Sequence, residues 1–250
     1  MTPDEDLADS MEANILPVEK WKVFSLTAVS YVEGSFMSFT FAVSSLLPLI
    51  ILVATVTLIL SRRDFHTIFY LVGQLLNEGM NFGLKHWAKE PRPTTTNSPQ
   101  MHFGHYGWPS SHSQFMSFLC VYMSLFVLIR WRLSSSNGTL WWLWKLLSLV
   151  GLLASALLVC VGRVYLGQHS ERQVLWGAAI GLALGIAWFF VVHVLLTPVF
   201  PVMTTWPICE YLMLRDCTLI PNIQLFEYSC TRSEARVRSR KRSYRPAKYD

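Results

Sequence analysis

The sequence predicts an all-α fold: a polytopic integral membrane bundle of about five transmembrane helices, with a sixth left open. Of the 250 residues, 52% are apolar and only 15% are charged, whereas soluble domains average about a quarter charged. The missing charge is concentrated in long apolar windows, and about 20 such residues are enough to cross roughly 30 Å of hydrocarbon. The five cysteines show no CxxC spacing, so the sequence does not indicate a zinc site.

The expected spans follow the apolar stretches in chain order. The first contains Pro48, which is expected to kink it. The second is less apolar and carries Glu78, Asn81 and Lys85 on one helix face. Because a carboxylate at membrane depth faces a bundle interior or a wet cavity, Glu78 either holds helices together or supports Lys85. The spans are residues 36–60, 65–85, 112–129, 143–162 and 174–196.

The segments outside these spans are acidic, broken or basic. The first 20 residues are acidic and are expected to be disordered. Residues 198–229 contain four prolines, which favours an interfacial segment and leaves a sixth span open. The predicted organisation is an N-terminal polar and interfacial segment, a transmembrane domain, an interfacial segment and a basic cytoplasmic tail: residues 1–34, 35–197, 198–231 and 232–250.

Five spans place the loops 61–64 and 130–145 and the C-terminal tail on one side of the membrane. These segments collect arginine and lysine, so the positive-inside rule makes that side cytoplasmic. The glycosylation sequon at Asn137 falls on the cytoplasmic side. Asn137 is therefore expected to remain unmodified.

Three polar islands, residues 85–93, 107–112 and 162–173, interrupt the apolar pattern on the opposite side. The topology brings together the end of span two, the start of span three and the turn between spans four and five. The islands supply the groups that are needed to hold and attack a phosphate. These groups are Lys85, Arg92, Ser110, Ser111, His112, Arg163 and His169.

Arg163 and His169 are six residues apart, so on a continuous helix they would point about 120° away from each other. Gly162 and Gly167 allow the chain to break and turn between them. With that turn, both side chains can face one pocket.

Each of the two histidines lies beside a Ser-x-x-Gln sequence that fits a capping box: Ser111 to Gln114, and Ser170 to Gln173. A capping box marks the start of a helix. The N–H groups and the positive dipole end at a helix start suit a bound phosphate.

The charged residues predict phosphate chemistry without a metal. Arg92 and Arg163 can donate forked hydrogen bonds to phosphate oxygens, and Lys85 adds a point charge. One neutral histidine can act as nucleophile, and the other, when protonated, as acid. Since no carboxylate cluster is available to hold magnesium, we expect no metal and no cofactor.

In this order, the islands resemble the three signature motifs of the type 2 phosphatidic acid phosphatase superfamily. The family pattern is Lys, six residues, Arg-Pro; then Pro-Ser-Gly-His; then Ser-Arg, five residues, His, three residues, Asp. The chain departs from it at three positions: Ser111 replaces Gly, Gly162 replaces Ser and Gln173 replaces Asp. The matching residues are Lys85, Arg92, Pro93, Pro109, Ser110, His112, Arg163 and His169.

The resemblance implies a role for each matched residue. His169 would be the nucleophile and form a phosphohistidine, while His112 would protonate the leaving oxygen. The family Asp orients the nucleophile, so Gln173 either takes that place without a charge or only closes the capping box with Ser170. The phosphate would be held by Lys85, Arg92, Ser110, Ser111 and Arg163.

Residues 76–81, 108–116 and 219–228 are similar to the dolichyl diphosphatases of the endoplasmic reticulum. This resemblance implies hydrolysis of dolichyl diphosphate to dolichyl phosphate on the luminal face, which recycles the lipid carrier of N-glycosylation. The expected partners are a polyprenyl diphosphate and the lipid bilayer, with no nucleic acid; no protein partner is indicated. Two alternatives stay open: a phosphatase for phosphatidate or another lipid phosphate, and an inactive lipid-binding or scaffold protein.

Overall fold

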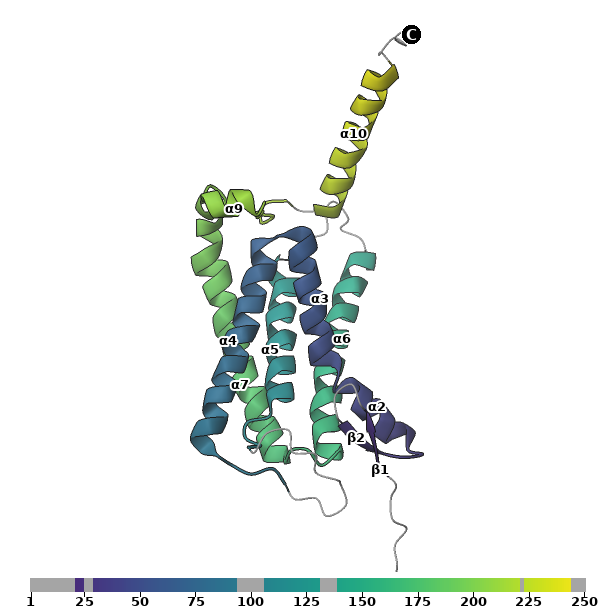
Figure 1. Cartoon of the computed structure of the whole chain (residues 1–250), viewed down its shortest axis with the longest axis vertical. Helices are drawn as coiled ribbons and strands as arrows, with labels where there is room; N and C mark the ends of the chain where they lie inside the picture. Colours follow the sequence, from purple (N-terminus) through teal and green to yellow (C-terminus); the bar gives the residue numbers. More distant parts are fainter. Residues whose placement is uncertain (1–20, 25–28, 94–105, 131–138, 221–222, 244–250) are drawn as a thin grey trace, which may run out of the picture.

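The computed structural model describes residues 21–24, 29–93, 106–130, 139–220 and 223–243, and most of them form one helical bundle (Figure 1). The predicted disorder of residues 1–20 and the sequon at Asn137 lie outside the described residues. A π-helical segment, η1 (Phe126–Arg130), follows α5, and η2 (Val191–Leu196) and η3 (Thr197–Val199) follow α7. The helices are α2 (Phe36–Ser44), α3 (Leu47–Arg62), α4 (Phe65–Ala88), α5 (Ser111–Leu125), α6 (Thr139–Tyr165), α7 (Glu171–Phe190), α8 (Phe200–Met203), α9 (Pro207–Tyr211) and α10 (Ile223–Ser243).

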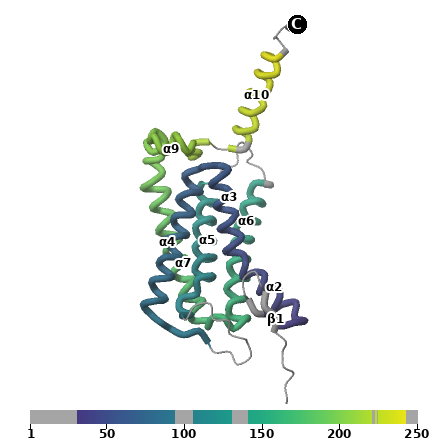
Figure 2. The backbone as a smooth tube through the Cα atoms, in the orientation of Figure 1, coloured from purple at the N-terminus to yellow at the C-terminus, as the bar shows by residue number. Residues whose placement is uncertain are grey.

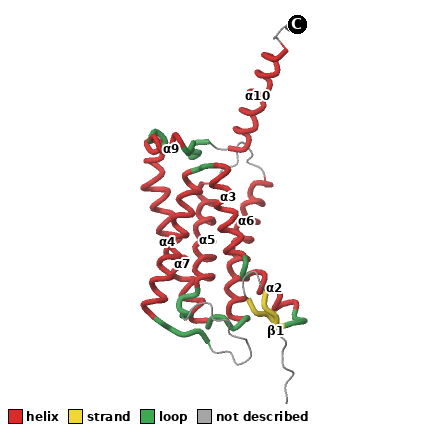
Figure 3. The backbone as a smooth tube through the Cα atoms, viewed as in Figure 1, coloured by secondary structure: helices red, strands yellow, loops and turns green. Residues whose placement is uncertain are grey.

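Among the described residues, four helical stretches are long and apolar enough to cross a membrane: Phe36–Arg62, Ser111–Arg130, Trp141–Tyr165 and Glu171–Met203. The fifth long helix, α4, has 24 residues and runs along the others (Figure 3). Its composition is less apolar because its buried face includes amide side chains. The predicted all-α membrane bundle of about five spans is therefore confirmed.

The first span is broken where proline chemistry predicts it. Helix α2 ends at Ser44 and α3 begins at Leu47, so Pro48 lies in the first turn of α3. Proline is tolerated there because the N–H that it lacks would have no partner within the helix. The two helices diverge at this point (Figure 1), which confirms the predicted kink.

Two segments differ from what the sequence predicts, and a third answers the question of a sixth span. Strand β1 (Trp21–Phe24) pairs antiparallel with β2 (Val29–Val32), a hairpin that the sequence did not predict. Between residues 198 and 220 the chain forms only short helices, and the described part contains no sixth apolar span. Helix α10 crosses the predicted boundary at 231–232, so the start of the basic tail is helical.

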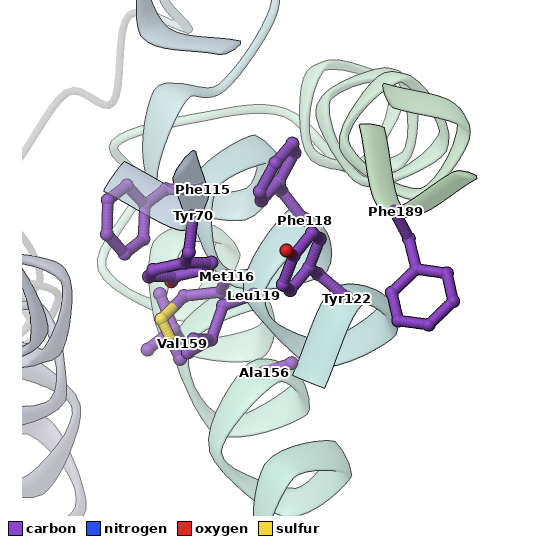
Figure 4. Close-up of a cluster of buried hydrophobic side chains, with 9 residues drawn as sticks. All are labelled: Tyr70, Phe115, Met116, Phe118, Leu119, Tyr122, Ala156, Val159 and Phe189. Atoms are coloured by element: carbon purple, nitrogen blue, oxygen red, sulfur yellow. The ribbon is translucent and has the colours of Figure 1, made fainter. Parts of the chain in front are cut away.

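Helix α5 lies at the centre of the bundle and packs most closely against α7. A Cβ atom at Gly177 would lie 2.5 Å from the carbonyl oxygen of Ser110, and one at Gly181 would lie 2.2 Å from that of Gln114. The absence of side chains at these two glycines therefore allows the two helices to pack closely. Around it lies the apolar core drawn in Figure 4: Tyr70, Phe115, Met116, Phe118, Leu119, Tyr122, Ala156, Val159 and Phe189.

The two ends of the bundle have different character. The end of α4, the start of α5 and the turn between α6 and α7 gather at one end (Figure 2). The turn between α3 and α4, helix α9 and helix α10 lie at the other. There Arg215 donates from its backbone N–H to the carbonyl oxygen of Arg63 at 2.8 Å and from Nε to that of Arg62 at 3.0 Å. The three polar islands therefore share one end, and the basic segments lie at the opposite end.

Candidate active site

The site lies where the three polar islands meet. Lys85 is in the last turn of α4, Arg92 is in the following loop and His112 is in the first turn of α5. Arg163 is near the end of α6, and His169 is in the turn before α7. All three cations act electrostatically on both histidines. The structure thus brings together five of the residues that the sequence singled out.

Arg163 is a buried cation with few protein partners. The residue is 5% exposed, and Nη1 donates to the hydroxyl of Ser45 at 3.4 Å. Its buried Nε has no hydrogen-bond partner among the described residues. Because an unmatched buried charge is costly, this geometry favours an anionic ligand. Ser45, which the sequence analysis did not identify, comes from the break between α2 and α3.

His169 is held in one orientation by its Nδ1 atom. Nδ1 lies 3.0 Å from the carbonyl oxygen of Gly107 and 3.2 Å from Oε1 of Gln173. Both atoms are acceptors, so Nδ1 carries the proton and Nε2 keeps its lone pair. Burial, followed by the charges of Arg163 and Arg92, lowers the pKa of His169 to about 3. The free imidazole is therefore neutral at physiological pH, as a nucleophile must be.

The turn between α6 and α7 uses one of the two predicted glycines. Gly167 has φ of +66°, a conformation that glycine adopts without steric cost. The backbone N–H of His169 then donates to the carbonyl oxygen of Arg163 at 3.3 Å, which closes the turn. The prediction for Gly162 was wrong, because this residue lies inside α6. A Cβ there would lie 3.0 Å from Cδ1 of Phe41, so its small size allows α2 to approach.

The predicted capping box at the start of α5 was also wrong. Helix α5 is capped at Ser110, one residue earlier, and the Ser110 side chain accepts no backbone cap bond. Gln114 instead accepts from Nδ2 of Asn81 at 2.7 Å and donates to Oδ1 of Asn77 at 2.8 Å. Ser110 is fully buried and its hydroxyl accepts from Ser113 at 3.1 Å. Ser111, by contrast, is half-buried at the helix start.

Gln173 makes the contacts of both roles considered for it. Its backbone N–H donates to Oγ of Ser170 at 3.3 Å, and its Oε1 accepts from the backbone N–H of Ser170 at 3.3 Å, so the capping box of α7 is present. The same Oε1 faces Nδ1 of His169. Its amide nitrogen donates to Oε1 of Glu90 at 3.0 Å and to the carbonyl oxygen of Pro91 at 2.9 Å.

The inward face predicted for α4 is correct for Asn81 but not for Glu78. Asn81 is 1% exposed and donates to the carbonyl oxygen of Pro109 at 3.3 Å, which anchors the second island. Glu78 is exposed, so it does not hold helices together through the bundle interior. Its carboxylate does act electrostatically on Lys85, as the supporting interpretation requires.

Comparison with known proteins places the chain in a family. The PAP2 superfamily matches residues 66–196. The chain therefore belongs to the PAP2 superfamily, which confirms the resemblance inferred from the three motifs. It is 45% identical to dolichyldiphosphatase 1 of Rhinolophus ferrumequinum, over 88% of this chain and 92% of that protein. It is 44% identical to dolichyldiphosphatase 1 of Homo sapiens, with the same coverage.

A solved structure is also similar: the first transmembrane PAP2 type phosphatidylglycerolphosphate phosphatase from Bacillus subtilis. The match covers 75% of this chain and 85% of that chain, with a TM-score of 0.48 and 22% sequence identity.

Proposed function

We propose that this protein hydrolyses dolichyl diphosphate to dolichyl phosphate and inorganic phosphate. The observation that carries the proposal is the cluster of Lys85, Arg92 and Arg163 around two histidines at one end of the bundle. An anion with several negative charges would neutralise these cations and supply the partner that Nε of Arg163 lacks within the described part of the chain. The relatives named dolichyldiphosphatase support the choice of a dolichyl diphosphate.

The reaction proceeds in two displacements. Nε2 of His169 attacks the terminal phosphorus, an N–P bond forms, and the bond from phosphorus to the bridging oxygen breaks. His112 donates its proton to that oxygen, and dolichyl phosphate leaves. A water molecule then attacks the phosphohistidine, His112 takes up its proton, and phosphate is released. The three cations stabilise the charge on the equatorial oxygens in both steps.

A diphosphate suits the site better than a phosphate monoester does. Lys85, Arg92 and Arg163 offer more cationic contacts than a monoester needs. The additional negative charge of a bound diphosphate is matched by these cations. The purified protein should therefore turn over dolichyl diphosphate faster than dolichyl phosphate or phosphatidate. Equal turnover of phosphatidate would favour a general lipid phosphatase instead.

The covalent intermediate gives a direct test of the reaction. Brief incubation with a polyprenyl diphosphate labelled in its terminal phosphate should transfer the label to the protein as acid-labile, base-stable phosphohistidine. Mass spectrometry should locate the label at His169. The variant His169→Ala should acquire no label and no turnover, while His86→Ala, an exposed histidine outside the cluster, should behave as the unmodified protein. Normal turnover by His169→Ala would refute the mechanism.

The site is assigned to the lumen of the endoplasmic reticulum, where it would recycle the carrier lipid for N-glycosylation. Support comes from the charge asymmetry of the bundle: Arg62 and Arg63 lie at the end opposite the site, together with the basic residues of α10. In sealed microsomes, added protease should digest a tag fused to the C-terminus. A protected tag would reverse the assignment.

A further inference from the structure

We propose that Glu90 is a positioning residue for the nucleophile, acting through the side-chain amide of Gln173. This inference rests on the proposed role of His169. Oε1 of Glu90 accepts a hydrogen bond from Nε2 of Gln173 at 3.0 Å, and Oε1 of Gln173 lies 3.2 Å from Nδ1 of His169. Three side chains therefore form a continuous chain of hydrogen bonds from a loop carboxylate to the imidazole.

Glu90 is needed because the oxygen and nitrogen ends of a side-chain amide have nearly the same shape but opposite hydrogen-bonding character. The oxygen and nitrogen of Gln173 could exchange places by a rotation of 180°, and the helix cap alone would resist that weakly. In the rotated state, the NH2 group would face the N–H groups of Ser170 and His169. The amide oxygen would then face the carboxylate of Glu90 and the carbonyl oxygen of Pro91, which are both acceptors. These two acceptors fix the amide in the orientation that accepts from Nδ1.

The orientation of the amide in turn shifts the balance between the two tautomers of His169. With Oε1 facing Nδ1, the proton stays on Nδ1 and Nε2 is free to attack phosphorus. With the NH2 group facing it, Nδ1 would keep only the carbonyl oxygen of Gly107 as an acceptor. More of the enzyme would then carry the proton on Nε2, which removes the lone pair that attacks phosphorus. Glu90 thus raises the fraction of enzyme that carries the reactive tautomer.

Glu90 also supports the other acceptor of Nδ1, through its backbone. The backbone N–H of Gly107 donates to the carbonyl oxygen of Glu90 at 2.7 Å, and the carbonyl oxygen of Gly107 lies 3.0 Å from Nδ1 of His169. A Cβ at Gly107 would lie 2.7 Å from Oε1 of Gln173, so this residue closes over the amide. A change in the Glu90 side chain leaves the backbone bond in place, and this separates the two contributions.

The first test is the variant Glu90→Ala, measured with the full chain in detergent and a polyprenyl diphosphate as substrate. The expected result is a fall in kcat of roughly tenfold, by analogy with partners that orient metal-binding histidines. KM should change little, because Lys85 and the arginines are untouched. The matched control is Glu171→Ala, which removes an exposed carboxylate close to His169 and should leave kcat within about twofold. A kcat for Glu90→Ala equal to that of the control would overturn the proposal.

The second test asks whether Glu90 acts through Gln173. In the background Gln173→Ala there is no amide to orient, so adding Glu90→Ala should cause no further loss. In the background Gln173→Asp, a carboxylate can accept from His169 directly, and Glu90 then only adds repulsion. Adding Glu90→Ala there should leave kcat equal or raise it. Equal losses in all three backgrounds would show that Glu90 does not act through the amide.

The two tests separate this inference from the proposed function. If the unmodified protein forms no phosphohistidine and releases no phosphate, the proposed function fails. If it does both and Glu90→Ala labels as fast as Glu171→Ala, only the role of Glu90 fails. A melting temperature is recorded for every variant, and a loss of kcat counts only where the protein remains folded.

Discussion

Replacing Gly177 with alanine should damage turnover more than stability, because this glycine sets the distance between α5, which carries His112, and α7, which begins two residues after His169. The added Cβ would lie 2.5 Å from the carbonyl oxygen of Ser110, whereas ordinary contact begins at 3.4 Å, so α5 must move about 0.9 Å away from α7. The contacting atom is the backbone carbonyl oxygen of Ser110, which cannot rotate aside as a side chain could. His112 lies two residues further along and moves with it.

A displacement of about 1 Å can cost up to about 100-fold in rate. Partial relaxation of α5 reduces this figure, so the expected fall in kcat/KM is between about tenfold and 100-fold. Overpacking costs about 1–3 kcal/mol of stability, and exchanging glycine for alanine within a helix returns about 1 kcal/mol. Gly177→Ala should therefore remain folded, with a modestly lower melting temperature.

The assay compares three alanine variants for phosphate release and for melting in detergent. Gly79→Ala is the control, because nothing lies within 4 Å of the added Cβ, and it should keep full turnover. Gly185→Ala crowds Val121 and Phe118, far along α5 from the site, and should lose stability with a smaller loss of turnover. If Gly177→Ala is folded and turns over as fast as Gly79→Ala, the reasoning is refuted.

Three further results are expected. Gln173→Ala should lower turnover at least about tenfold and stability by about 0.5–2 kcal/mol; a loss of stability alone would leave it only a cap. Turnover should survive EDTA and be inhibited by vanadate, and a requirement for added magnesium would contradict the mechanism. Because burial lowers the pKa of His169 from 6.5 to about 3, the unfolded chain binds more protons between these values, so stability should fall as the pH drops below 6.5. His169→Gln should weaken this dependence, and unchanged slopes in melting curves would contradict it.

Local patterns in the sequence predicted the spans well because each span is a property of one stretch. Helix α4 was the hardest span to predict from the sequence, because Gln74, Asn77 and Asn81 reduce its mean hydropathy. All three are nearly fully buried. The rule that intramembrane polar residues face the interior predicted the direction of Asn81. The same rule failed for Glu78, which is exposed.

The parts of the site that the sequence did not predict depend on contacts between distant residues. Ser111 and Gln114 have the spacing of a capping box, but Gln114 bonds instead to Asn77 and Asn81, more than 30 positions earlier in the chain. Ser45 approaches Arg163 across 118 positions. Such pairings are set by how helices pack, and local spacing contains no information about them.

The two roles considered for Gln173, capping α7 and orienting His169, depend on the same atom, Oε1. The capping role and the orienting role both require an acceptor at Oε1, and this oxygen lies 3.3 Å from the backbone nitrogen of Ser170 and 3.2 Å from Nδ1 of His169. An aspartate has one methylene fewer and two equivalent oxygens, so it has no orientation to choose. The amide of a glutamine has two different orientations, and an acceptor beside its nitrogen must fix the productive one. Because Gln173 replaces the family aspartate, the site needs an acceptor for the amide nitrogen, and the carboxylate of Glu90 provides it.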